Sequence, residues 1–217
     1  MILYRLMNAQ FAVDSIENQR LKVSNVIELN DPSDCAPVIT ERPAEYDEFP
    51  ELLHARLFKQ VSECIGVICY TESIEDPVVW SHYGDSHRGI ALGFELSPSE
   101  YTQVKYKDEK PEISVSSFKD EPDMGIKDHP ILHTKSPSWS YEKEWRKILC
   151  FREKCITSGG MYFFEFDKKT LKEVVLGDRC VIGKNYIYQT LEANGYNNDV
   201  CVKSAVNLSH KFEIMIN

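Results

Sequence analysis

The stretch GVICYTESIEDPVVWSHYGDSHRGIALGFEL, residues 66–96, decides the fold. It contains two compact apolar runs, at 66–70 and 89–96, whose length and composition are typical of buried strands. Between them, the Asp-Pro pair at 76–77 marks the start of a helix, because Asp caps helix N-termini and Pro is tolerated at the first helical position. The stretch therefore predicts two neighbouring or near-neighbouring strands joined by a short helix that contains residues 80–83.

Apolar spacing and turn signals predict further elements on both sides of this unit. We expect helices around 11–19, 51–65 and 182–194, and strands at 2–6, 21–25, 143–151, 161–166, 171–177, 199–205 and 211–216. Strands outnumber helices and do not alternate with them regularly, and neither a dinucleotide-binding glycine motif nor a Walker loop is present. We therefore predict a single α+β domain over residues 1–217, with mixed or antiparallel sheets and few helices.

The region from 105 to 135 differs from the rest of the chain. It is polar, contains several prolines and has weak periodicity. We predict an irregular insertion or a loosely packed subdomain, a candidate lid, and we expect residues 107–135 to be the least regular and most mobile part of the protein.

Composition excludes several classes of protein. The net charge is −9, from 25 basic and 34 acidic residues, and no run of five basic residues occurs, which argues against a generic binder of the phosphate backbone. The chain shows neither a signal peptide nor a membrane span, so we expect a cytoplasmic protein without membrane contact. The seven cysteines form no C-x-x-C pair, and we expect free, buried thiols and no bound metal.

Polar and aromatic residues concentrate at strand edges and strand ends, where a scaffold can direct them into one cleft. They fall at four places in the sequence, which are Tyr4-Arg5, Asn30-Asp31, the segment 70–83 and the segment 140–146.

Several of these residues also have structural interpretations. Arg5 could form a surface ion pair, Asn30 and Asp31 are typical turn formers before Pro32, and His82 could be a hydrogen-bonded core residue.

Glu142 and Glu144 are expected to alternate on one strand and so to face the same side, with Trp145 facing the core. Two buried carboxylates on one face are unfavourable unless a cation or a ligand lies near them. The pair therefore predicts a site that contains a counter-charge.

Six motifs together resemble the bacterial family catalogued as domain of unknown function 2971. They are LYR, ELNDP, CYTES, VVWSHYGDSHRGIALGFE, SWSYEKEWR and LKEVVLG, and they span nearly the whole chain. The family name implies no activity.

The layout also resembles, more distantly, the core of ADP-ribosyltransferases. Arg5 lies on the first expected strand, Tyr70 and Thr71 end a later one, and Glu144 opens a late strand with Glu142 two residues before it, in an E-x-E pattern. Arg5 stands where one subclass has His, and the Tyr-Thr pair matches neither a Ser-Thr-Ser strand nor a strict His-Tyr-Glu set.

This second resemblance implies an ADP-ribosyltransferase-like core that uses NAD as a substrate. The catalytic residues it implies are Glu144, Glu142 and His82. The NAD-binding residues it implies are Tyr4, Arg5, Asn30, Asp31, Tyr70, Thr71, Trp80, Ser81 and Tyr83. It further implies an enzyme that modifies a macromolecule, nucleic acid or protein, or hydrolyses NAD, and that acts as a toxin or in phage defence, with a partner protein or antitoxin.

The physical chemistry of each role is straightforward. Cleavage of the nicotinamide–ribose bond passes through an oxocarbenium-like state, which the carboxylate of Glu144 would stabilise while Glu142 orients or deprotonates a nucleophile. The planar guanidinium of Arg5 suits phosphates, and Tyr70 and Tyr83 offer flat faces to nicotinamide.

Two other classes of function stay open at this stage. One is a nuclease or hydrolase, with or without a metal, that uses His82, Asp85, His87 and the glutamate pair. The other is a non-catalytic binding or regulatory module in which WSHYGD is a structural knot.

Overall fold

A computed structural model describes residues 1–41, 43–114, 126–196 and 199–217. Its largest element is an 11-stranded sheet. The strands of this sheet are β1 (Ile2–Met7), β2 (Arg20–Asn25), β4 (Ile65–Thr71), β5 (Ile90–Glu95), β6 (Thr102–Gln103), β10 (Glu144–Cys150), β11 (Ile156–Ser158), β12 (Met161–Glu165), β13 (Leu171–Leu176), β14 (Cys201–Asn207) and β15 (Ile214–Ile216).

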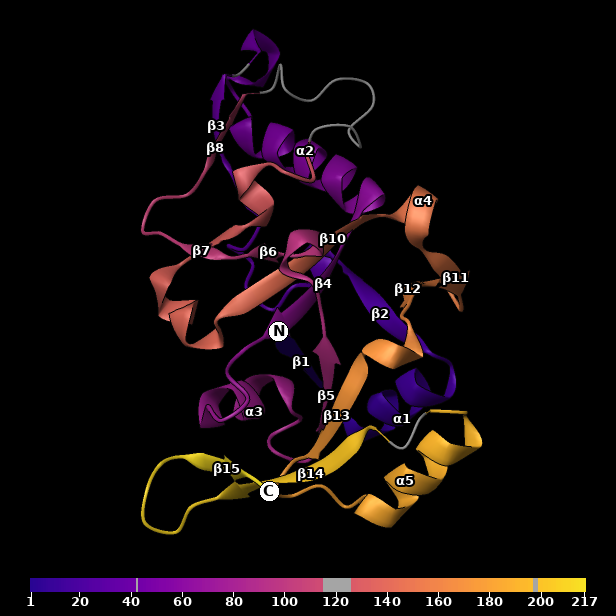
Figure 1. Cartoon of the computed structure of the whole chain (residues 1–217). Helices are drawn as coiled ribbons and strands as arrows, with labels where there is room; N and C mark the ends of the chain where they lie inside the picture. The colour runs from indigo at the N-terminus through magenta and orange to yellow at the C-terminus, as the bar shows by residue number, and fades with distance from the viewer. Residues whose placement is uncertain (42, 115–125, 197–198) are drawn as a thin grey trace.

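The order of the strands is β11-β12-β2-β4-β1-β5-β13-β14-β15, and β10 pairs with both β4 and β6 (Figure 1). Neighbouring strands run antiparallel except β13 and β14, which are parallel. Two small parallel sheets join β3 (Val38–Glu41) to β8 (Glu112–Ser114) and β7 (Lys105–Tyr106) to β9 (Thr134–Lys135). The predicted α+β single domain with a mixed, mostly antiparallel sheet is confirmed.

The helices cover the sheet in two regions. They are α1 (Ala9–Glu17), α2 (Pro50–Cys64), α3 (Pro77–Tyr83), α4 (Phe151–Lys154) and α5 (Lys184–Ala193), with 3-10 helices such as η6 (Pro130–Leu132) and η7 (Pro137–Glu142). In the half of the sheet around β5 and β13, α1 and α5 lie together on one face, at the lower right of Figure 1, while Trp80 of α3 packs on the other face with Ala91 and Val175.

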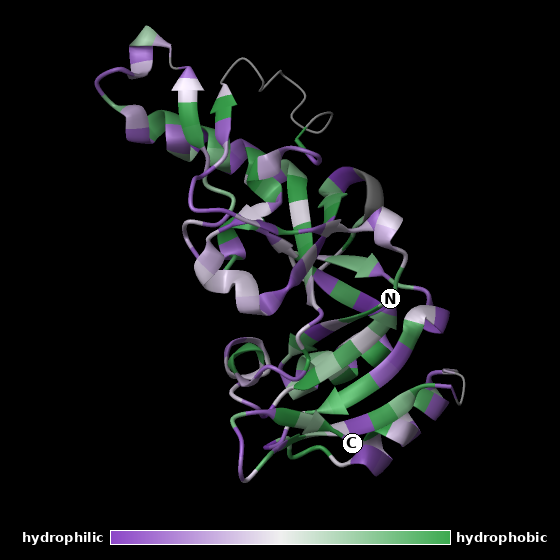
Figure 2. Cartoon of the chain, turned by 60° about the vertical axis from the view of Figure 1, so that its left-hand side comes forward, coloured by the Kyte–Doolittle hydropathy of each residue, from purple (hydrophilic) through white to green (hydrophobic). Residues whose placement is uncertain are grey.

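In the other half of the sheet, α2 and the segment 126–132 cover β4. The buried residues of α2 include Leu53, Leu57 and Val61, and the helix shows alternating hydrophobic and hydrophilic bands in Figure 2. The spacing of four residues that predicts this helix therefore also marks its buried face. None of the helices in the described ranges is long and apolar enough to cross a bilayer.

The 66–96 unit forms as its sequence predicts. β4 and β5 are near neighbours that flank β1 and both run antiparallel to it, and α3 connects them. The Asp76 carboxylate accepts a hydrogen bond of 2.7 Å from the Val78 N–H, as expected of a helix cap. The fully buried Trp80 donates its indole N–H to the Ile74 carbonyl at 2.7 Å, so this tryptophan anchors the connection to the sheet.

The turn after α3 has an unusual backbone. Asp85, Ser86 and His87 have φ angles of +50°, +53° and +68°, a left-handed conformation that costs a non-glycine residue about 1–2 kcal/mol each. Gly89 closes the turn by donating its N–H to Gly84 at 2.7 Å, and a Cβ at this position would lie 2.2 Å from the Met7 carbonyl oxygen. This part of the sequence is a structural turn packed tightly against β1.

The element ends differ from the prediction by a few residues, and several short strands were not predicted. β3, β6, β7, β8, β9 and β11 have two to four residues each. Such strands are too short to show a periodicity of two.

One expectation about the glutamate pair is wrong. Glu142 was expected on the same strand as Glu144, but it is the last residue of η7, and β10 begins only at Glu144. Ser136 caps η7 ahead of Pro137, and Lys143, at φ +43°, turns the chain between the two glutamates. A helix start of the same kind as at 76–77 therefore precedes the strand.

The expected irregular insertion is described only at its two ends. Residues 115–125 of the 105–135 segment lie outside the described residues, so its irregularity and mobility stay a prediction. Its ends contain β7, β8, η6 and β9.

Candidate functional site

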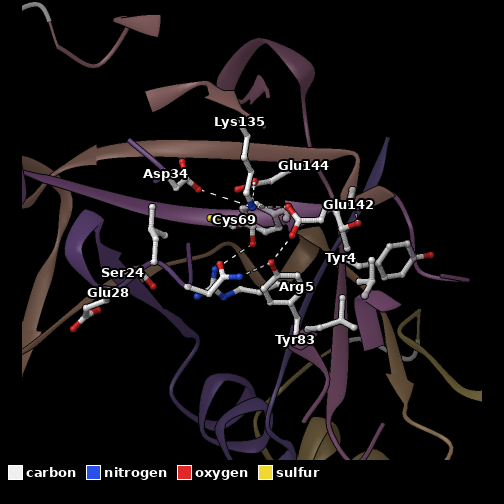
Figure 3. Close-up of a pocket in the computed structure, with 16 residues that line it drawn as sticks. Tyr4, Arg5, Ser24, Glu28, Asp34, Cys69, Tyr83, Lys135, Glu142 and Glu144 are labelled. Atoms are coloured by element: carbon white, nitrogen blue, oxygen red, sulfur yellow. Dashed lines mark hydrogen bonds and ion pairs between the residues drawn. The ribbon is translucent and has the colours of Figure 1, made fainter. Parts of the chain in front are cut away.

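A cavity of about 260 Å³ lies where β1, β4 and the start of β10 come together (Figure 3). The polar side chains that matter most for its chemistry are those of Arg5, Asn30, Thr71, Tyr83, Glu142 and Glu144. They come from β1, the turn before Pro32, the end of β4, α3, the end of η7 and the start of β10. Residues far apart in the sequence therefore line one cavity.

The strand register of the sheet brings residues of β1, β4 and β10 together at the cavity. Thr71, the last residue of β4, pairs with Tyr4 of β1 on one side and with Glu144 of β10 on the other. Its hydroxyl donates a short hydrogen bond to the Glu142 carbonyl and accepts one of 2.8 Å from the Ser73 N–H. Thr71 therefore ties the segment that carries both glutamates to the end of the central strand.

Arg5 lies in a split of the sheet. β4 pairs with β1 at its end and with β2 near its start, and the two partner strands diverge between these points. The Arg5 guanidinium bridges this split, donating to the carbonyls of Cys69 at 3.2 Å and Lys22 at 3.0 Å. It forms no ion pair with a carboxylate of the described residues, so its positive charge faces the cavity without a counter-charge.

Five buried charged residues lie together at the cavity, and we call them the buried ion cluster: Asp34, Lys135, Glu142, Glu144 and Arg146. The first four line the cavity, and Arg146 lies behind them in contact with Asp34 and Glu144. Their side chains are at most 5% exposed. Since three carboxylates face two cations, the cluster carries one net negative charge when all members are ionised.

Arg146 holds one side of the buried ion cluster. Its Nε and Nη2 contact the two carboxylate oxygens of Glu144 at 2.7 and 3.1 Å, and Nη1 and Nη2 contact those of Asp34 at 3.0 and 2.6 Å. Lys135 holds the other side, with its Nζ at 2.7 Å from Glu142 and 3.3 Å from Glu144. Figure 3 shows Lys135 between Asp34 and Glu142.

The two glutamates have opposite pKa shifts. Burial alone would raise the pKa of Glu144, but the charge and hydrogen bonds of Arg146 outweigh it and lower the pKa to about 2. Burial raises the pKa of Glu142, and Lys135 offsets that rise only in part. Glu144 therefore stays ionised at neutral pH, and Glu142 is the member of the pair that takes up a proton at a higher pH.

Aromatic rings surround the Glu142 side of the cavity. The Tyr83 hydroxyl donates a short hydrogen bond to Glu142 and accepts one of 3.2 Å from the Asn30 amide. Next to it, His82 lies 5.9 Å from Trp139 and 6.2 Å from Tyr141, measured between ring centroids.

Asp31 accepts a hydrogen bond of 2.8 Å from the Trp139 indole N–H. Since Trp139 is part of the aromatic group, Asn30 and Asp31 both tie the turn before Pro32 to this side of the site.

Eight of the sequence-predicted site residues line the cavity, and four do not. Those that line it are Tyr4, Arg5, Asn30, Tyr70, Thr71, Tyr83, Glu142 and Glu144, and those outside its lining are Asp31, Trp80, Ser81 and His82. Trp80 is fully buried in the core, Ser81 is exposed, and His82 bonds Tyr141 through Nδ1 at 2.9 Å.

Two of the three tyrosines that line the cavity, Tyr4 and Tyr70, have their main contacts outside it. The Tyr4 hydroxyl bonds Glu173 at 2.9 Å, because its ring crosses Gly93, where a Cβ would lie 2.8 Å from the ring. The Tyr70 ring packs edge-on against Phe94 and Tyr101. Of these three predicted tyrosines, Tyr83 is the one whose hydroxyl bonds a carboxylate of the cavity.

Sequence reasoning missed Asp34, Lys135 and Arg146. The sequence does contain a signal for Arg146. Arg146 lies two residues after Glu144 on the expected strand, so the two opposite charges face the same side and can pair. Asp34 and Lys135 had none, since they lie in a turn and in the polar 105–135 segment.

The residues of the alternative nuclease site do not converge. Asp85 accepts from the Asn8 amide at 2.8 Å, and His82 bonds Tyr141. His87 Nδ1 is buried, with no hydrogen-bond partner in the described part of the chain. Across the described ranges, no group of three or more His, Cys, Asp or Glu side chains is placed to hold a metal ion. Of the cysteines, Cys35, Cys64 and Cys150 are buried as expected, whereas Cys201 is exposed.

Comparison with known proteins yields one match. Residues 79–147 match the family described as "Protein of unknown function (DUF2971)", a stretch from α3 into β10 that includes Tyr83, Lys135 and both glutamates of the cavity. The match covers less than half of the chain, whereas the motifs predicted a resemblance over nearly all of it. Neither the curated proteins nor the solved structures contain a match, so the resemblance to ADP-ribosyltransferases finds no support there.

Proposed function

We propose that the cavity binds NAD and cleaves the bond between its nicotinamide and ribose, as an ADP-ribosyltransferase-like enzyme that modifies a macromolecule or hydrolyses NAD. The observation that carries the proposal is the meeting of Arg5, Thr71 and the Glu142–Glu144 segment in one cavity. These are the parts that the E-x-E resemblance requires. They come from β1, from β4 and from the end of η7 with the start of β10, and β4 pairs with both β1 and β10.

The charge distribution of the cavity suits a ligand with both signs of charge. The buried ion cluster supplies net negative charge on one wall, and Arg5, which has no carboxylate partner among the described residues, supplies a cation on another. NAD carries a cationic nicotinamide ring and an anionic diphosphate. The ring would lie towards Glu142 and Glu144, and the phosphates towards Arg5.

The size of the cavity limits what it can enclose. Its 260 Å³ lie just below the range of about 300–1,000 Å³ that is typical of small-molecule sites. The nicotinamide and its ribose would be enclosed, and the rest of the dinucleotide would extend outside.

The opposite pKa shifts of the two glutamates assign their roles. The bond from ribose C1′ to the nicotinamide nitrogen breaks, and its electron pair leaves with the nicotinamide, which becomes neutral. Glu144, held ionised by Arg146, stabilises the positive charge that develops on the ribose. Water or a group of the target then forms the new bond to C1′, and its proton passes to Glu142.

Thermal unfolding in the presence of NAD tests the binding step. NAD at about 100 times its Kd should stabilise the protein by about 2.7 kcal/mol. Arg5→Met should abolish this stabilisation. Arg20→Met should not, because Arg20 pairs with Asp14 away from the cavity. If NAD fails to stabilise the parent protein, or stabilises the Arg5→Met variant equally, the proposal is wrong.

One observation favours a second candidate, a non-catalytic binding module. Both glutamates have their carboxylate oxygens bonded within the protein, and Trp80 with the left-handed turn after α3 behaves as a structural knot. Such a module would bind NAD or another small ligand without releasing nicotinamide. Measuring nicotinamide release separates the two functions.

A further inference from the structure

The two ends of the 105–135 segment meet beside the cavity. β7 pairs with β9, with Tyr106 opposite Lys135. The Lys105 N–H donates to the His133 carbonyl at 2.8 Å, and the Lys107 N–H donates to the Lys135 carbonyl at 3.0 Å. The backbone on both sides of Tyr106 is thereby fastened to the backbone of β9.

This pairing places two side chains against the glutamates. The Tyr106 hydroxyl accepts a hydrogen bond of 2.9 Å from the Glu144 N–H. The Lys135 ammonium lies 2.7 Å from Glu142, 3.3 Å from Glu144 and 3.9 Å from Asp34, and its side chain is 3% exposed. Lys135 therefore forms part of the cavity wall, and Tyr106 holds the backbone of Glu144 next to it.

Lys135 differs from Arg146 in what it contacts. Arg146 bonds Glu144 and Asp34, whereas within the described residues the ion pairs of Glu142 are with Lys135. Without Lys135, the buried ion cluster would hold three carboxylates and one cation. The mutual repulsion of Glu142 and Glu144 would then oppose ionisation of Glu142.

We propose that Lys135 is a positioning residue of the site: the β7–β9 pairing holds it against Glu142, and opening of that pair withdraws it and disables the site. The activity part of this inference rests on the proposed function. The coupling is reciprocal: if a ligand in the cavity stabilises the β7–β9 pairing, formation of that pairing raises the affinity of the cavity for the ligand by the same factor.

The groups that face Glu142 come from every neighbouring element and set its titration. They are Tyr83 from α3, Tyr141 from η7, Tyr106 from β7, Lys135 from β9 and Glu144 from β10. Since Lys135 is the cation among them, its removal should shift the titration of Glu142 towards higher pH.

The test uses the full-length protein without ligand. Carbon NMR of the glutamate carboxyls gives the titration midpoint of Glu142, identified by the signal lost in Glu142→Gln. Lys135→Met should raise this midpoint by about one pH unit or more, and Lys135→Arg should leave it near the parent value. The control Lys147→Met should not change it, because Lys147 pairs with Glu100 outside the cavity.

A second variant opens the β7–β9 pair without removing a charge of the cluster. Lys107→Pro deletes the N–H that bonds the Lys135 carbonyl and should move the Glu142 midpoint in the same direction. It also gives a result if Lys135→Met does not fold. An unchanged Glu142 midpoint in whichever of the two variants folds overturns the inference.

Nicotinamide release provides the second readout. Lys135→Met should lower kcat at neutral pH at least tenfold with a much smaller change in KM, and its pH profile should move with the Glu142 midpoint. If the parent protein releases no nicotinamide, the proposed function fails, while the ligand-free titration still decides the role of Lys135.

Discussion

Replacing Arg146 by Met should destabilise the protein more than an ordinary core substitution would. The Arg146 side chain is 0% exposed, and it bonds both oxygens of Glu144 and of Asp34. Removing one partner from a buried ion pair costs about 3–5 kcal/mol, because the remaining charge is left uncompensated. For a chain of this length, that loss corresponds to a fall in Tm of about 6–20 °C.

The pKa of Glu144 gives an independent magnitude. Lowering it from 4.5 to about 2 corresponds to about 3 kcal/mol of stability. A carboxylate with a lowered folded-state pKa contributes this stability fully above its unfolded pKa, and the contribution is lost as the pH falls through the folded value. The deficit of Arg146→Met should therefore shrink as the pH falls from about 4.5 to about 2.

Urea unfolding of the parent and of Arg146→Met at pH 7 and at about pH 3 measures both effects. Arg179→Met serves as the control, because Arg179 is exposed and should change stability by at most about 0.5 kcal/mol. A deficit below about 1 kcal/mol at pH 7, or a deficit that does not depend on pH, would refute the electrostatic account of the buried ion cluster.

Two further predictions concern the site and the fold. NAD should bind less tightly as the pH falls through the raised pKa of Glu142, because protonation removes the net negative charge of the buried ion cluster. Isothermal titration from about pH 8 to about pH 4 measures this, and a constant Kd over that range contradicts it. Gly89→Ala should lower Tm markedly, because its Cβ would lie 2.2 Å from the Met7 carbonyl oxygen. Gly183→Ala is the control and should have little effect, because no described atom outside its chain neighbours lies within 4 Å of its Cβ position. Equal melting temperatures of the two variants would contradict the tight packing of this turn against β1.

The sequence predicts the frame of this fold well because the frame depends on local signals. Apolar runs of strand length and the Asp76-Pro77 helix start produce β4, α3 and β5 as expected. Ser136-Pro137 is a helix start of the same kind, and it puts Glu142 at the end of η7 and not on the strand that the E-x-E pattern predicts. The two glutamates nevertheless meet, because Lys135 and the turn at Lys143 bring both carboxylates to one wall.

The counter-charges of the site could not be predicted in the same way. The expectation that a buried glutamate pair needs a cation nearby is met by Lys135 and Arg146. Lys135 comes from a polar segment without periodicity, and a parallel pairing of two-residue strands brings it to the site. Contacts of this kind depend on tertiary packing, which leaves no pattern in the local sequence.

Nicotinamide release by the parent protein and by Glu144→Gln tests the central claim most directly. The variant is nearly isosteric and leaves Arg146 and Lys135 with two carboxylates, so it should remain folded. Loss of the charge that faces the oxocarbenium-like state should lower turnover by two orders of magnitude or more, corresponding to about 3–4 kcal/mol in the barrier. Glu100→Gln, an exposed residue outside the cavity, should retain parental turnover. Unchanged turnover in a folded Glu144→Gln protein, or no nicotinamide release by the parent, would contradict the account.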